Sequence, residues 1–80
     1  MSDVAERVKK VTAEVLKVDL GRVVDDARFV EDLGAESIQS IELIAAYEEE
    51  FDIEIDEEAG TAVKTVGGAV KFIEDVLANQ

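Results

Sequence analysis

Few side chains in this sequence of 80 residues are suited to chemistry, and one serine stands out among them. The chain has no His and no Cys, the side chains that most often serve as general bases, nucleophiles and zinc ligands. Ser37 lies in the stretch LGAESIQSIEL, where a loop broken by Gly34 turns into an amphipathic helix. That position exposes a hydroxyl which nothing in the sequence can activate. We therefore expect no catalytic residue and no enzymatic activity. A simple helix N-cap is one role for Ser37.

Composition indicates one small globular domain over residues 1–80. The chain is 48% hydrophobic and 35% charged, as in folded proteins, and its length suits a single domain. No apolar run reaches the roughly 18 residues that a membrane-spanning helix needs. The opening residues MSDVAERVKK lack the apolar segment of a secretory signal. The absence of Cys also fits a reducing compartment, so we expect a cytoplasmic location. We also expect a monomer.

The negative charge is concentrated in one continuous part of the chain. Residues 29–63 hold twelve acidic residues and no Lys or Arg, whereas the other 45 residues hold eight acids and eight bases, for a net charge of −12. Such a segment repels nucleic acids and anionic membranes, and it attracts basic protein surfaces. Solubility alone would not require this segregation. The pattern predicts a protein partner with a basic surface, and neither nucleic acid nor membrane.

The hydrophobic pattern predicts a small helical bundle. Apolar residues recur at helical spacing in three sets: Val4, Val8, Val11 and Val15; Leu43, Ile44, Tyr47 and Phe51; Val66, Val70, Ile73 and Leu77. We expect a first helix that ends near Lys17, a second from Ser37 to about Phe51, and a last one capped by Thr65. EEAGTAV is predicted to form a short helical turn, and DIEID a linker. The long loop over residues 18–36 is predicted to be pinned to the core by Phe29, Val30 and Leu33.

The second predicted helix has an additional apolar strip opposite its core stripe. At about 100° per residue, Ile38, Ile41 and Ala45 fall on that opposite side. Glu42 and Glu49 flank the strip on one edge, and Glu48 flanks it on the other. This pattern favours a docking surface for a partner that is apolar at its centre and basic at its rim. The alternative is that Ile38 or Ile41 packs under the long loop, or is simply an exposed apolar residue.

The segment FVEDLGAESIQSIELIAAYEEEFDIEI resembles the prosthetic-group segment of the acyl carrier proteins. The family motif is Asp-Ser-Leu after a Leu-Gly-Ala turn, and it reads Glu36-Ser37-Ile38 here. ERVKKV, ARFVEDLG, YEEEF and KTVGGAV resemble the family in order and spacing, so the likeness covers nearly the whole chain. It implies an antiparallel bundle of three longer helices and one short helix. It also implies that a phosphopantetheinyl transferase attaches 4′-phosphopantetheine from coenzyme A to Ser37, and that acyl chains are carried on the arm as thioesters.

The resemblance further implies partners and a pocket. The partners are acyl-transferring, condensing and reducing enzymes with basic docking patches, of fatty acid synthesis or a related pathway. The implied docking residues are Glu36, Ile38, Ile41, Glu42, Ala45, Glu48 and Glu49. The implied acyl pocket lies between the helices, against Phe29, Leu43, Tyr47 and Ile55. Tyr47 stands where an aliphatic residue is usual, and we expect it to make the pocket shorter or more polar.

Departures from the family pattern leave alternatives open. Glu36, Ile38, Gln39 and Ala45 differ from the usual residues, which points to a specialised carrier, for example in a polyketide-like pathway. Gly67 and Gly68 are expected to loosen the start of the last helix. A peptidyl or D-alanyl carrier and an unmodified acidic interaction module are the rival functions. The acidic run DIEIDEEAG lacks the glycine and glutamate spacing of an EF-hand, so no metal site is expected.

Overall fold

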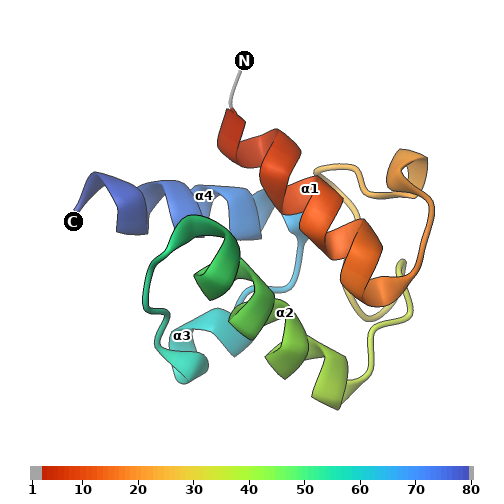
Figure 1. Ribbon diagram of the computed structural model, residues 1–80. Coiled ribbons are helices and arrows are strands. Elements are labelled where there is room, and N and C mark those ends of the chain that lie inside the picture. The colour runs from red at the N-terminus through yellow and green to blue at the C-terminus, as the bar shows by residue number, and fades with distance from the viewer. Residues whose placement is uncertain (1–2, 80) are drawn as a thin grey trace.

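The computed structural model describes residues 3–79, and these residues fold into helices without any β-strand. The elements are α1 (Asp3–Leu16), the 3-10 helix η1 (Leu20–Arg22), α2 (Ser37–Phe51), α3 (Glu57–Thr61) and α4 (Val66–Ala78). In Figure 1, α1 and α2 lie side by side and run in opposite directions, α4 packs on α1, and the short α3 lies against α2. The predicted all-α bundle of three longer helices and one short helix is confirmed. Within the described range, no helix has the length and apolarity to cross a bilayer.

Helix α1 contributes a buried stripe and a buried hydroxyl. Val8 and Val11 of the predicted stripe are buried, while Val4 and Val15 at its edges are only partly buried. Thr12 is also completely buried, which the apolar pattern did not indicate. The helix ends where Lys17 takes a left-handed conformation, with a φ of 58°, a common way to terminate a helix.

Helix α2 begins and ends at the predicted residues. Its N-cap is Glu36, whose backbone N–H donates to the side-chain Oε1 of Gln39 at 2.9 Å, one half of a capping box. At the other end, Asp52 adopts the left-handed region with a φ of 55°, a region that Asp tolerates better than most residues. Arg7 of α1 holds this end in place, because its Nε lies 2.8 Å from the Glu50 carboxylate. The Arg7 guanidinium also stacks 4.4 Å above the Phe51 ring centre.

Helix α4 begins as the sequence predicts and provides much of the core. The Thr65 hydroxyl caps it by accepting a hydrogen bond from the Gly68 N–H at 3.1 Å. Val66 and Ile73 are completely buried, and Ala69 between them is buried as well. The same apolar face meets α1, so the first and last helices of the chain enclose one continuous core.

The long loop between α1 and α2 is held down more extensively than predicted. Phe29 and Leu33 are buried, as expected, together with Val23, Ala27 and Ala35, whereas Val30 is 56% exposed. The prediction for Val30 was therefore wrong. A tight turn explains the difference: the Gly34 N–H donates to the Val30 carbonyl at 3.1 Å, and the turn leaves the Val30 side chain on its outer side.

This loop is also hydrogen-bonded to the connection between α3 and α4. The Phe29 N–H donates to the Lys64 carbonyl, and the Val66 N–H donates to the Ala27 carbonyl, both at 3.0 Å. The Gly67 N–H donates to the Asp25 carbonyl at 2.9 Å, and a Cβ at position 67 would lie 3.0 Å from that same oxygen. Gly67 was expected only to loosen α4. The structure gives the residue a further role, because the missing side chain lets the loop approach the helix closely.

Candidate functional site

Ser37 is the first residue of α2 and is exposed to solvent. The N-cap is Glu36, so the alternative role of Ser37 as the N-cap is wrong. Among the described residues, nothing forms a hydrogen bond with the Ser37 hydroxyl. The N–H groups in the first turn of a helix have no carbonyl partner within the helix. They give the helix N-terminus a partial positive charge, which favours a negative charge nearby. Ser37 thus presents a free hydroxyl at a helix end that tolerates an attached phosphate.

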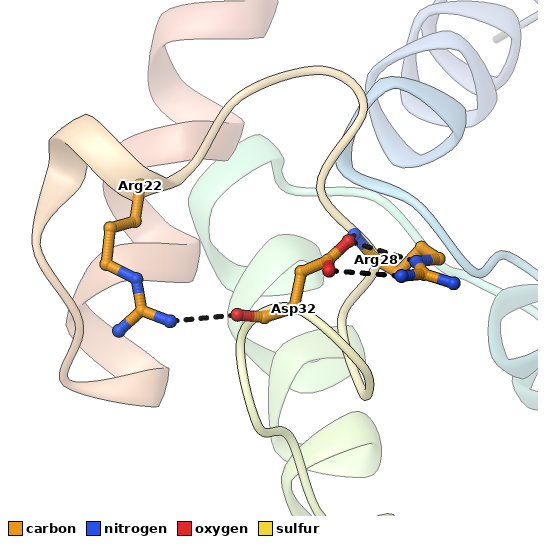
Figure 2. A network of polar contacts seen from close by, with 3 residues as sticks. All are labelled: Arg22, Arg28 and Asp32. Atoms are coloured by element: carbon orange, nitrogen blue, oxygen red, sulfur yellow. Dashed lines mark hydrogen bonds and ion pairs between the residues drawn. The ribbon is translucent and has the colours of Figure 1, made fainter.

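The turn that leads into Ser37 is held by a small network of charged groups, shown in Figure 2. Arg28 binds the Asp32 carboxylate through Nε at 3.0 Å and Nη2 at 3.2 Å, while its backbone N–H donates to the same carboxylate at 2.8 Å. From the other side, Arg22 of η1 donates to the Asp32 carbonyl at 2.9 Å. Asp32 therefore joins η1 to the turn that precedes α2.

The pKa values of this pair are shifted in the direction that the geometry requires. Hydrogen bonds from the Arg28 side chain, and then from its backbone N–H, lower the pKa of Asp32 below its usual value. The Asp32 carboxylate in turn raises the pKa of Arg28. From the sequence, Asp32 was only one charge of the acidic segment. The spacing of four residues between Arg28 and Asp32 was the available signal, but nothing in the sequence indicated the contact from Arg22.

The surface of α2 that faces away from the core carries the predicted docking residues, and we call it the outer face. It comprises Glu36, Ile38, Ile41, Glu42, Ala45, Glu48 and Glu49. Ile38 is 63% exposed and Ile41 is 49% exposed, so neither packs under the long loop. Glu48 differs from the other members because it is half-buried and accepts a hydrogen bond from the Ile55 N–H at 2.8 Å. The outer face therefore offers two exposed isoleucines with carboxylates around them.

A cavity of about 70 Å³ lies on another side of α2, between this helix, the long loop and α4. Phe29, Leu43, Tyr47 and Ile55, the four residues implied as an acyl pocket, all line it. Ser40, which is one turn beyond Ser37 on α2, lines the cavity as well. The lining also includes four residues that the sequence did not indicate: Val63, Ala69, Phe72 and Ile73. Val63 lies in the connection between α3 and α4, and the other three lie on α4. Their contribution depends on how these segments pack, which no local pattern indicates.

One family model matches this chain over most of its length. The match covers residues 6–73, and the family is described as the phosphopantetheine attachment site. The chain belongs to the phosphopantetheine attachment site family. Membership implies a covalently attached 4′-phosphopantetheine, and it makes the protein a phosphopantetheine carrier.

The residues of this carrier fit the attached group. The chain has three serines, at positions 2, 37 and 40; Ser2 lies outside the described residues, and Ser40 is half-buried in the cavity wall. Ser37 combines exposure, a free hydroxyl and a helix N-terminus. No cluster of His, Cys, Asp or Glu suited to a metal ion occurs within residues 3–79.

Tyr47 places a buried tyrosine in the wall of the carrier's cavity. Its side chain is 5% exposed, and its hydroxyl lies 2.5 Å from the Thr12 hydroxyl of α1. Thr12 donates its proton to the Val8 carbonyl at 2.7 Å, so Tyr47 must be the donor to Thr12. Burial raises the pKa of Tyr47 to about 12, because the tyrosinate would lose its solvation there. The hydroxyl is thus satisfied on α1, outside the cavity lining, and does not make the cavity more polar.

Proposed function

We propose that Ser37 is the residue that carries 4′-phosphopantetheine and that the protein transports acyl chains between enzymes. The observation that supports this assignment is the exposed Ser37 hydroxyl, free of hydrogen bonds, at the first residue of α2. A phosphopantetheinyl transferase needs access to the hydroxyl, and the helix N-terminus stabilises the phosphodiester that results. When bound, the group supplies a thiol on a flexible arm, to which an acyl chain is joined as a thioester.

The cavity is proposed to receive the acyl chain. Ser37, Ser40, Ile44 and Tyr47 follow one another at spacings of three and four residues along α2, so they lie along one side of the helix. Tyr47 lies ten residues after Ser37, which is about 15 Å along the helix axis. An arm attached at Ser37 would therefore deliver its cargo at the Ser40 end of the cavity. The predominantly apolar lining, with Phe29 and Leu43 among its residues, favours a hydrocarbon chain over a peptidyl or other polar cargo.

The outer face of α2 is proposed to bind the transferase and the enzymes that load, extend or reduce the acyl chain. Two exposed isoleucines, Ile38 and Ile41, supply apolar contact area. Glu36, Glu42 and Glu49 are exposed around them and would attract basic side chains on a partner. The pathway is proposed to be fatty acid synthesis or a related specialised acyl pathway. The protein itself is proposed to catalyse no reaction, in keeping with its lack of His and Cys.

Mass spectrometry tests the assignment of Ser37. Incubation of the unmodified protein with coenzyme A and a broad-specificity phosphopantetheinyl transferase should add one phosphopantetheine. Ser37→Ala should abolish the addition, and Ser40→Ala, the matched control one turn further along α2, should retain it. Addition to the Ser37→Ala variant at the wild-type level would show that the attachment site lies elsewhere.

A further inference from the structure

The Tyr47 side chain extends from the cavity to α1. It lines the cavity together with Leu43 of the same helix and Phe29 of the long loop. Its hydroxyl, at the far end of the ring, contacts Thr12, which is not part of the lining. The ring therefore separates the cavity from α1. An aliphatic residue at this position would leave part of that space open to the cavity.

The Tyr47 ring is also fixed in place. Thr12 is completely buried, and its proton is already donated to the Val8 carbonyl of its own helix. That bond holds the Thr12 hydroxyl in one orientation, so its oxygen is a fixed acceptor for the Tyr47 hydroxyl. If the ring moved aside, a buried hydroxyl would lose its partner, which proteins rarely tolerate. The ring is therefore a fixed wall and not a mobile gate.

We infer that Tyr47 and Thr12 together form a stop that limits the length of the acyl chain enclosed by the cavity. The carrier would enclose short acyl chains completely and leave the ends of longer ones outside. The inference rests on the proposed function, because it takes the cavity as the acyl site. It goes beyond that proposal by naming the cargo as short-chain and by assigning its length limit to one hydrogen-bonded pair of residues.

The test compares how acyl chains of increasing length stabilise the protein. The transferase loads butyryl, hexanoyl, octanoyl or decanoyl phosphopantetheine from the corresponding acyl-coenzyme A, and mass spectrometry verifies loading. The melting temperature of each form is compared with that of the form without an acyl chain. Each additional buried methylene should raise Tm by about 3–6 °C in a domain of this size. In the wild type the rise should stop at a short chain, and in Tyr47→Leu it should continue to longer chains.

Three further variants separate the stop from general effects on stability. Phe51→Leu is the matched control, since Phe51 is buried on α2 but does not line the cavity; it should lower every Tm and leave the length at which the rise stops unchanged. Thr12→Val removes the acceptor while keeping the side-chain shape, and it should extend the limit. Thr12→Ser keeps the acceptor, so its length limit should equal that of the wild type.

Several outcomes would overturn the inference. An identical length limit in the wild type and Tyr47→Leu would show that Tyr47 is not the stop. A limit extended by Tyr47→Leu but not by Thr12→Val would remove the role given to Thr12. Stabilisation by no chain in any variant would show that the cavity does not enclose the cargo. Failure of loading itself would instead contradict the proposed attachment at Ser37, and mass spectrometry detects that failure separately.

Discussion

The two sides of helix α2 differ in how completely this chain covers them. Towards the core, Leu43 and Tyr47 are buried, and the Tyr47 hydroxyl is satisfied by Thr12. On the outer face, Ile38 and Ile41 are 63% and 49% exposed. One side of the helix therefore contributes to folding, while the other keeps apolar area available. Exposed apolar area on a chain with a net charge of −12 is better explained by binding to other molecules than by packing within this one.

The largest effect is expected from truncating a side chain on the core side of α2. Comparison with a truncation on the outer face tests whether the two sides differ in their contribution to folding. Leu43→Ala should lower the free energy of unfolding by about 2–5 kcal/mol, because it leaves a void in a close-packed core. Ile41→Ala, an equally large aliphatic truncation two residues away on the outer face, should change it by no more than about 0.5 kcal/mol. Urea denaturation followed by circular dichroism measures both. Similar losses in the two variants would contradict the distinction between the two sides.

The core side should also show a specific response to alkaline pH. The pKa of Tyr47 is raised from 10.0 to about 12 in the folded protein, so folding favours the protonated form. That stabilisation is fully present below pH 10 and is lost as the pH rises from about 10 to about 12, at up to about 1.4 kcal/mol per pH unit. Tyr47→Phe should not show this loss in urea denaturation.

The chain contains a single Tyr, so tyrosinate absorbance reports Tyr47 without ambiguity. The titration in the wild type should have its midpoint near 12 and coincide with the loss of helicity. A midpoint at the ordinary tyrosine value, with helicity retained, would mean that the hydroxyl is not buried against Thr12.

The outer face should respond to charge in binding and not in folding. Glu42→Lys should slow association with the transferase by about 2–5-fold at low salt, since an exposed charge contributes roughly 0.4–1 kcal/mol. It should also weaken the dependence of the association rate on salt. Stopped-flow or surface plasmon resonance measurements provide these rates. Glu6→Lys, an exposed position on α1, is the matched charge control. An equal reduction by both variants would show that net charge alone matters.

The smallest expected effect concerns the start of α2. Ser37→Ala should alter the free energy of unfolding by less than about 0.5 kcal/mol, because Ser37 is the first helical residue and its hydroxyl makes no bond within the described part of the chain. Thr65→Ala removes the observed N-cap bond of α4 and should cost about 0.5–2 kcal/mol. Thermal denaturation of the two variants sharpens the comparison. A larger loss for Ser37→Ala than for Thr65→Ala would mean that Ser37 supports the helix.

Much of this arrangement follows from local patterns in the sequence. Spacings of three and four residues locate the helices, since each turn of helix must present an apolar side chain to the core. The break at Gly34 followed by Ser37 marks the start of α2, and the two isoleucines opposite the core stripe identify the outer face. Each of these features depends on residues within one or two helical turns of one another. Such features can be recognised from the sequence because local geometry alone determines them.

Tertiary structure alone decided the features that join distant parts of the chain. Thr12 and Tyr47 are 35 residues apart, so no local pattern identifies the acceptor that satisfies the buried tyrosine. Gly67 is a weak helix former by its type, but its close approach to Asp25 requires the loop to be folded onto α4. Val30 has the apolar character of a core residue, and a backbone turn directs it outward. In each case the outcome depends on which groups the packed helices bring within a few ångströms of one another, and this spatial relation is absent from residue order.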